Sequence, residues 1–204
     1  TQSRSSAASD VYKRQLLHGV SGSGKTTLLN IMSGLLKPTS GTVFVEGSDI
    51  YSLSTSERDD IRLNRIGMIF QEHSLIVDFT VRENVELILR VRGFGSRSRV
   101  MAIEALERVG IAHLQDRYPR QLSGGEAQRV GIARAIAGDR PILLADEPTG
   151  QLDRRNSQMV FELLRALAED EKGRTVVLSS HDPTAKEYAH RSCELVDGHL
   201  EDSC

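Results

Sequence analysis

The chain has 204 residues, of which 39% are hydrophobic and 26% are charged, and its 26 Lys+Arg against 28 Asp+Glu give a formal net charge of −2 at pH 7. Hydrophobic content at this level excludes a fully disordered chain, and the length fits one domain with an inserted lobe. The near-zero charge gives no support for nucleic acid as a partner. Two cysteines, Cys193 and Cys204, are too few for a disulfide framework or a zinc cluster, and they favour a reduced, cytosolic setting.

No apolar run approaches the ~18–20 residues that span a bilayer, so we expect any role at a membrane to pass through a partner. Residues 1–15 are polar and rich in Ser and Ala, without an apolar period. We expect them to be non-native or disordered and to lie outside the fold.

From residue 16 onward, short apolar runs alternate with patterns of helical period. Strands are predicted at 16–20, 42–45, 66–70, 142–145, 175–178 and near 194–196. Helices are predicted at 25–36, 81–91, 99–109, 126–137 and 157–168, with a short helix before the last strand. The alternation predicts an α/β fold with a mostly parallel sheet, and the strand-free stretch from about 75 to 125 predicts an inserted helical subdomain.

A glycine-rich motif follows the first predicted strand: Gly19-Val-Ser-Gly-Ser-Gly24-Lys25-Thr26 fits G-x-x-x-x-G-K-[ST]. Glycines let the backbone wrap closely, so that N–H groups point at phosphate oxygens, and the next helix places its positive end there. Lys25 is predicted to reach the β- and γ-phosphates, and the Thr26 hydroxyl to bind Mg²⁺. The alternative is a chance glycine-rich turn, which the flanking strand and helix disfavour.

A second motif is the apolar run 141–145, which ends in Asp146 and Glu147. A buried strand that delivers Asp146 at its carboxyl end can hold Mg²⁺, and Glu147 can polarise a water for attack on a γ-phosphate. Two more predicted strands are followed by Gln71 and His181. Taken singly these are ordinary loop residues, but the carboxyl ends of parallel strands share one edge of a sheet, so we expect all of them at one site.

The segment Leu122-Ser123-Gly124-Gly125-Glu126 opens the helix predicted at 126–137. Ser123 and Glu126 fit a capping box, which is a purely structural explanation. A capping box does not need two glycines, however, and Gly124 and Gly125 bare the helix amides to a ligand. The sequence therefore predicts a second anion site, and two such sites in one chain suggest that each completes the nucleotide pocket of another subunit.

In this order, GVSGSGKTT, Gln71, LSGGEAQ, ILLADEPTG, Asp153 and His181 resemble the ATP-binding cassettes of ABC transporters, over about residues 16–200. FQEHSLIVDFTVRENVEL and ADEPTGQLD are similar to the branch that energises macrolide export and lipoprotein release. The resemblance implies a P-loop NTPase fold and Mg²⁺-dependent ATP hydrolysis that powers a membrane transporter of the export or extraction type. An ATP-sensing regulatory subunit that signals through a membrane partner, and a non-transport ABC ATPase, are the alternatives.

The resemblance also implies roles for individual residues. The ATP phosphates would be held by Gly19, Ser21, Gly22, Ser23, Gly24, Lys25, Thr26 and Thr27. Thr26, Gln71 and Asp146 would serve the Mg²⁺ ion. Glu147 would be the catalytic base, and His181 would contact the γ-phosphate. Ser123, Gly124, Gly125 and Glu126 would bind the ATP of an opposing cassette, with Asp153 at the seam between the two.

The implied partners are a second cassette in a head-to-tail dimer, expected to be a homodimer, and integral-membrane permease subunits that hold the chain at the inner face of the cell membrane.

Cassettes of this family usually carry two N-terminal strands and an adenine-stacking aromatic residue before the phosphate loop. Tyr12 is the nearest aromatic residue there. We therefore expect an incomplete antiparallel β lobe and weakened adenine binding.

Overall fold

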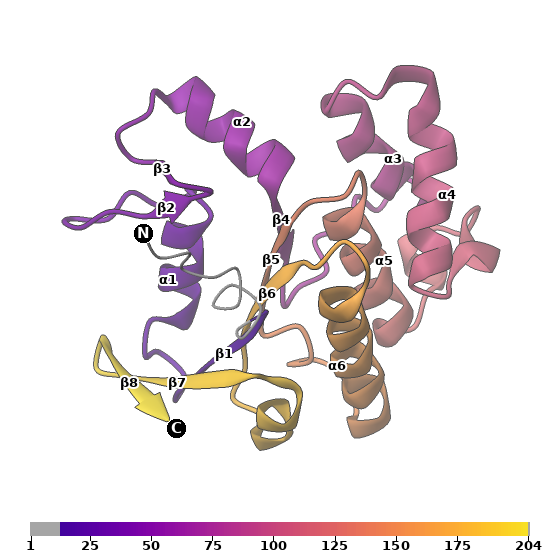
Figure 1. Cartoon of the computed structure of the whole chain (residues 1–204). Coiled ribbons are helices and arrows are strands. Elements are labelled where there is room, and N and C mark those ends of the chain that lie inside the picture. Colours follow the sequence, from indigo (N-terminus) through magenta and orange to yellow (C-terminus); the bar gives the residue numbers. More distant parts are fainter. Residues whose placement is uncertain (1–12, 204) are drawn as a thin grey trace.

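The computed structural model describes residues 13–203, and a six-stranded sheet forms its centre (Figure 1). In chain order the strands are β1 (Arg14–His18), β4 (Ile66–Ile69), β5 (Ile142–Asp146), β6 (Thr175–Ser179), β7 (Arg191–Val196) and β8 (His199–Ser203). Across the sheet they lie in the order β4-β5-β6-β1-β7-β8, with every pairing parallel except that of β7 with β8. The predicted α/β fold with a mostly parallel sheet is confirmed.

The first strand begins earlier than its apolar residues indicate. Arg14 and Gln15, which composition assigns to the segment outside the fold, pair with Val176 and Val177 of β6. Parallel pairing on both sides buries Leu16 and explains why a polar start does not prevent strand formation here. The expectations for residues 1–12, including the one for Tyr12, lie outside the described residues and stay predictions.

Different elements cover the two faces of the sheet, because successive side chains of a strand point to opposite faces. In β5, Leu143 and Ala145 share one core with residues of α5 and α6, whereas Leu144 shares the other core with Leu29 of α1. The helices that pack on the sheet are α1 (Lys25–Met32), α2 (Thr55–Arg65), α5 (Gly124–Ile136) and α6 (Arg154–Glu169). Figure 1 shows α1 and α2 on one side of the sheet and α5 and α6 on the other.

A helical unit lies between β4 and α5 and packs against α5 (Figure 1). It contains α3 (Val81–Val91), η1 (Gly95–Arg97), α4 (Ser98–Arg108), η2 (Ala112–Leu114) and η3 (Pro119–Gln121). Residues 70–123 are all described and form no strand. Helix α3 has the predicted bounds because Thr80 and Glu83 form a capping box at its start and an apolar stripe, including Val85 and Leu89, is buried.

Some helix ends differ from the predictions, because a capping residue or a left-handed glycine sets them and the spacing of apolar residues does not. The predicted helix 25–36 is too long: α1 ends at Met32 because Gly34 adopts a left-handed conformation with φ 77°. Helices α5 and α6 begin two and three residues earlier than predicted, since Ser123 and Asp153 cap them.

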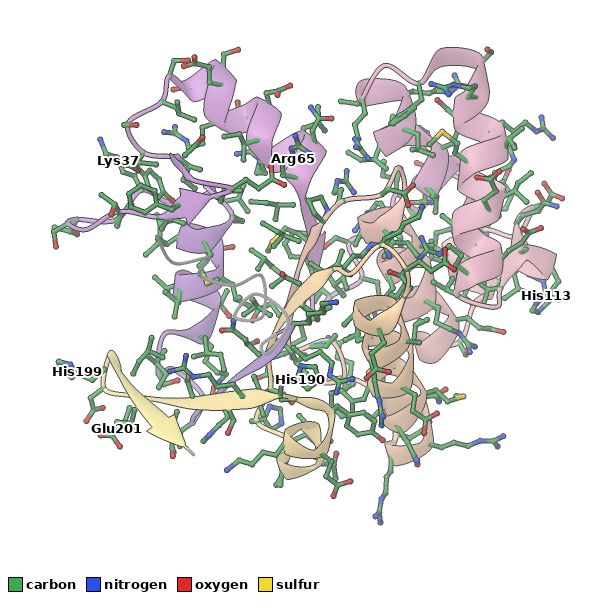
Figure 2. All side chains as sticks on the ribbon, in the orientation of Figure 1. Lys37, Arg65, His113, His190, His199 and Glu201 are labelled. Carbon is green, nitrogen blue, oxygen red and sulfur yellow. The ribbon has the colours of Figure 1, made fainter. Side chains whose placement is uncertain are left out.

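Three elements have no counterpart among the predictions: helix α2, strand β8 and the short strand β3 (Ser48–Asp49), whose partner β2 (Phe44–Val45) lies within the strand predicted at 42–45. Helix α2 has no fully buried residue, and its Ile61 packs partly buried against the core that contains Leu29. Ser54 and Glu57 form its capping box. Arg65, labelled in Figure 2, ends the helix and pairs with Glu46 at 3.2 Å. A second sheet pairs β2 antiparallel with β3. Strand β8 completes an antiparallel hairpin with β7, and its residues 199–201 are exposed, so no buried apolar run marks them in the sequence.

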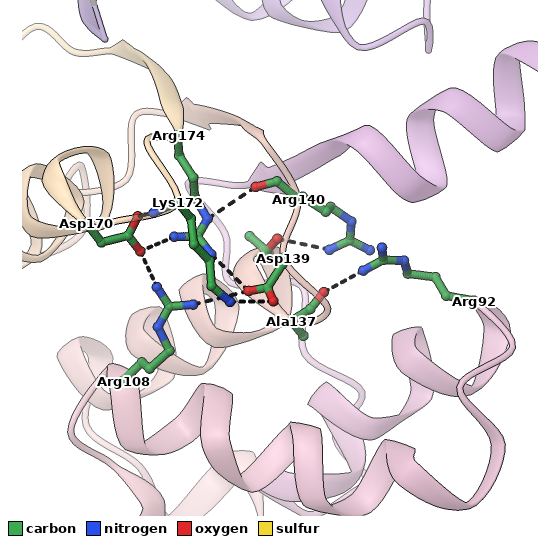
Figure 3. Close-up of polar contacts among 9 residues, drawn as sticks. Arg92, Arg108, Ala137, Asp139, Arg140, Asp170, Lys172 and Arg174 are labelled. Carbon is green, nitrogen blue, oxygen red and sulfur yellow. Dashed lines mark hydrogen bonds and ion pairs between the residues drawn. The ribbon is translucent and has the colours of Figure 1, made fainter.

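An ion-pair cluster fixes the edge of the core at which β5 and β6 begin (Figure 3). Arg174, almost fully buried, pairs with Asp170 and with Asp139, and its Nε donates to the carbonyl of Arg140. Arg108 of α4 pairs with the same two carboxylates, which connects the helical unit to the core.

Within residues 13–203, no helix is both long enough and apolar enough to cross a bilayer.

Candidate functional site

The phosphate loop connects β1 to α1, and its glycines sit where other residues are strained or obstructed. Gly22 and Gly24 have φ of 83° and 103°, the left-handed region that favours glycine. A Cβ on Gly19 would lie 2.4 Å from the carbonyl oxygen of Leu195 in β7. Gly24 is the N-cap of α1 and supplies no side-chain cap. The loop therefore lies tight against the sheet and leaves the first amides of α1 free of a capping side chain.

Lys25 is the first residue of α1 and is only 7% exposed. Its Nζ donates to the carbonyl oxygens of Gly19 at 2.8 Å and Val20 at 3.1 Å. The same nitrogen lies 3.5 Å from Oε1 of Glu147. The buried cation thus joins the phosphate loop to the carboxyl end of β5.

Asp146 ends β5 directly beside Ser179, the last residue of β6. The Ser179 hydroxyl donates to Oδ1 of Asp146 at 2.7 Å. Glu147, one residue further on, has φ of 45° and donates its backbone N–H to Ser179, to the carbonyl oxygen at 3.1 Å and to Oγ at 3.0 Å. Two adjacent parallel strands therefore present both carboxylates at one edge of the sheet.

The Glu147 carboxylate contacts two side chains, one through each oxygen. Oε1 faces Lys25, and Oε2 lies 2.9 Å from Nδ1 of His181. The backbone N–H of His181 also donates to Oε2, at 3.3 Å. The Glu147 side chain is 11% exposed, whereas that of His181 is 65% exposed. A buried carboxylate thus has a buried cation on one side and an accessible imidazole on the other.

A cavity of about 500 Å³ opens between the phosphate loop and the end of β5. Its lining consists of Val20, Ser21, Gly22, Gly24, Lys25, Thr26, Thr27, Gln71, Glu147 and His181. Gly19, Ser23 and Asp146 lie beside it without lining it. Gln71 packs against Gly150, where an added Cβ would lie 3.0 Å from Gln71 Nε2. Gly150 was not identified from the sequence, because the contact joins the ends of two separate strands.

The Leu122–Glu126 segment contributes no residue to this cavity. Ser123 is the N-cap of α5, and its N–H and hydroxyl donate to Oε2 of Glu126 at 2.7 and 2.8 Å. These hydrogen bonds, first from the backbone and then from the side chain, lower the pKa of Glu126 below its ordinary value. The capping box expected from the sequence is therefore present.

The N-terminus of α6 lies against the N-terminus of α5. Asp153 caps α6 by accepting from the backbone N–H of Asn156 at 2.9 Å and from its side-chain Nδ2 at 2.6 Å. The backbone hydrogen bond is the larger cause of a lowered pKa at Asp153. A Cβ on Gly125 would lie 2.5 Å from Asn156 Oδ1. Any larger residue at position 125 would therefore collide with Asn156. The sequence alone did not identify Asn156.

The family model described as ABC transporter matches residues 10–150 of the chain. The chain belongs to the ABC transporter family. The cassette is 45% identical to the lipoprotein-releasing system ATP-binding protein LolD of Blochmanniella floridana, over 89% of its own length and 77% of that protein. It is 44% identical to the uncharacterized ABC transporter ATP-binding protein MJ0796 of Methanocaldococcus jannaschii, over 90% and 80% of the two chains.

Solved structures agree with the family. The dimeric post-hydrolysis structure of the MJ0796 cassette, bound to ADP and Pi, superposes with a TM-score of 0.84 and 38% identity, covering 95% of this chain and 86% of that one. The likeness confirms the P-loop NTPase fold. The cassette binds ATP and is an ATP hydrolase, an activity that powers membrane transport in this family.

Proposed function

We propose that the cassette hydrolyses ATP with Mg²⁺ in the cavity between the phosphate loop and β5, and that this drives an export or lipoprotein-extraction machine. One observation carries the first part. Glu147 holds Lys25 and His181 on its two carboxylate oxygens, at 3.5 and 2.9 Å, inside a cavity lined by the phosphate loop. The identity with LolD supports the second part.

The phosphate loop fits the polyphosphate of ATP. Its backbone N–H groups at the start of α1 have no capping side chain, and the Ser23 hydroxyl is buried without a hydrogen-bond partner among the described residues. Lys25 supplies an ammonium group to the cavity lining. We assign the β- and γ-phosphates to these donors, because amides at a helix N-terminus and a buried ammonium both favour an anion.

Glu147 is the proposed general base. A γ-phosphate beside Lys25 competes with the carboxylate for the ammonium group, so one carboxylate oxygen becomes available to accept a proton from the attacking water. The water oxygen then bonds to the γ-phosphorus as the bond to the bridging oxygen of ADP breaks. His181 is exposed enough to donate to the γ-phosphate while Nδ1 stays on Glu147.

The oxygen donors near the cavity fit Mg²⁺, which prefers carboxylate, hydroxyl and amide oxygens together with substrate phosphates. Thr26 and Gln71 line the cavity, and Asp146 lies at its edge next to Glu147. We assign these three side chains to the ion. When bound, the ion neutralises charge on the β- and γ-phosphates.

The test of this site is Glu147→Gln, with Glu107→Gln on the exposed side of α4 as the matched control. An amide cannot take the proton, so we expect phosphate release by Glu147→Gln to fall by roughly 10²–10⁴-fold while ATP binding persists. Glu107→Gln should match the parent chain. Normal turnover in Glu147→Gln would remove the base assignment.

We further propose that two cassettes join head to tail, with Ser123, Gly124, Gly125 and Glu126 of one facing the ATP of the other and Asp153 at the seam. The dimeric structures of the MJ0796 cassette support this arrangement, as does the absence of the segment 123–126 from the cavity lining within this chain. Ser123→Arg subunits mixed with Lys25→Ala subunits should regain activity, because one composite site is then intact. A mixture that forms mixed dimers and remains inactive contradicts the arrangement.

The proposed membrane contact is the cleft of about 510 Å³ between α2, β4 and α3, beyond Gln71. Its lining is mainly apolar and includes Leu35, Phe70, Ile88 and Val91. We assign a permease subunit to this cleft, which would place the cassette at the inner face of the membrane. Val91→Glu should release the cassette from membranes that contain its transporter and leave the ATPase rate of the purified chain unchanged.

A further inference from the structure

A serine hydroxyl joins the two carboxylate-bearing residues at the end of β5. Ser179 ends β6, is fully buried at 0% exposure, and stands in register with Asp146 of β5. Its Oγ donates to Asp146 Oδ1 at 2.7 Å and accepts the backbone N–H of Glu147 at 3.0 Å. A hydroxyl has one proton to donate, and here that proton is committed to the carboxylate.

The contact matters because of the conformation at Glu147. A φ of 45° lies in the left-handed region, which residues with a side chain seldom adopt without support from their surroundings. Both acceptors of the Glu147 N–H, a carbonyl oxygen and Oγ, belong to Ser179. That conformation is what sets the carboxylate between Lys25 and His181.

Ser180, the next residue in the chain, makes different hydrogen bonds. Ser180 is equally buried, but its Oγ accepts the N–H of Asp182, and its own N–H donates to Leu17. These contacts shape the turn that leads to η4 (Pro183–Tyr188). The contact with both strand-end carboxylate residues is thus particular to the Ser179 hydroxyl and is not shared by the buried hydroxyl beside it.

We infer that Ser179 is a positioning residue for ATP hydrolysis, whose hydroxyl orients the Asp146 carboxylate and holds the Glu147 backbone in one geometry. The inference rests on the roles proposed above for Asp146 and Glu147. Ser179 does not touch the reacting atoms, so it acts only through these two residues. Its loss should slow turnover and leave nucleotide binding by the phosphate loop intact.

The test compares Ser179→Thr with Ser179→Val, two side chains of the same shape that differ in the hydroxyl. We expect kcat of Ser179→Val to fall by about 10-fold, the scale of a hydrogen bond to a charged group, with KM for ATP unchanged. Ser179→Thr should retain most of the parent kcat. Equal kcat values in the two variants, whether both high or both low, overturn the inference, because the hydroxyl then makes no difference. Ser179→Ala serves for Ser179→Val if the latter fails to fold.

A second readout needs no nucleotide. Hydrogen exchange at the Glu147 amide should be faster in Ser179→Val than in Ser179→Thr, since only the threonine keeps an Oγ acceptor. Equal exchange in the two variants overturns the inference. This measurement also separates two failures: normal turnover in Glu147→Gln removes the proposed base, whereas the exchange comparison still judges whether Ser179 holds that backbone.

Discussion

Glycines stand at the starts of both α1 and α5, as the N-cap Gly24 of the first helix and the first residue, Gly124, of the second. The sequence predicts an anion site at each start, yet the structure gives the two N-termini opposite surroundings. At α1 the N-cap is Gly24, the first turn contains no acidic residue, and Lys25 is buried beside it. At α5 the N-cap is Ser123, and the carboxylate of Glu126 already lies over the helix start. The N-terminus of α1 is therefore left open to an anion, whereas the Glu126 carboxylate already occupies the N-terminus of α5.

The second N-terminus is built like those of two ordinary helices. The same reciprocal hydrogen bonds join Ser54 to Glu57 at α2 and Thr80 to Glu83 at α3. What separates α5 from them is the pair Gly124 and Gly125. In the proposed dimer a capping box and a ligand site share this segment, and the two glycines are what distinguishes α5 from α2 and α3. The following experiments test how far that distinction goes.

The largest effect is expected at α1. Lys25→Ala removes the cation that lines the cavity and should lower the rate of phosphate release by roughly 10²–10³-fold, as the loss of a preorganised donor does. Lys37→Ala is the control, because Lys37 is exposed and lies near the opposite end of α1 (Figure 2). Equal losses in the two variants would mean that charge in general, and not the placement of Lys25, matters.

A smaller effect distinguishes the two uses of α5. Ser123→Ala and Thr80→Ala each remove an N-cap, so each should lower the free energy of unfolding by about 1 kcal/mol. Both values come from urea unfolding. If Ser123 also faces ATP in a dimer, only Ser123→Ala should in addition slow hydrolysis. Matching ATPase rates in the two variants would reduce Ser123 to a capping residue.

A double-mutant cycle can measure how strongly Gly125 and Asn156 depend on each other. Gly125→Ala places a Cβ against Asn156 Oδ1, so it should be less favourable in the parent chain than in Asn156→Ala, where the obstruction is gone. We expect a coupling of about 0.5–1 kcal/mol from unfolding free energies. Additive effects would show that Asn156 moves aside without cost, and that the glycine is needed for another reason.

The smallest effect concerns pH. Because the pKa of Glu126 is lowered in the folded chain, its carboxylate stabilises the fold above the ordinary glutamate pKa of about 4.3, and that contribution is lost as pH falls through the lower folded value. The stability difference between the parent chain and Glu126→Gln should therefore be constant near neutral pH and shrink in acid. Glu83→Gln should behave alike, since hydrogen bonds from Thr80 lower the pKa of Glu83. A difference that grows in acid would contradict the assigned cause.

Much of this architecture is predictable because its signals are local. The buried runs of β4, β5 and β6 and the amphipathic α3 show the period of their element, and the predicted capping box of α5 joins Ser123 to Glu126 within one turn. Helix α2 escaped prediction because it has no fully buried residue, and the end of α1 was misjudged because Gly34, inside the predicted helix 25–36, terminates it. The spacing of apolar residues in a sequence indicates which side chains are buried. It gives no information about an element that is largely exposed, or about a helix that ends because one residue adopts a left-handed conformation.

The sequence by itself determined the motifs: a phosphate loop of fixed spacing, two carboxylates after a buried run, and a glutamine and a histidine after two others. Only the tertiary structure decided which of them share a cavity and which oxygen of Glu147 faces Lys25 and which faces His181. It also decided that Ser179 serves both strand-end residues and that Asn156 touches Gly125. The physical reason is that motif spacing is set along one chain, whereas these contacts depend on strand order and register, which bring together residues more than thirty positions apart.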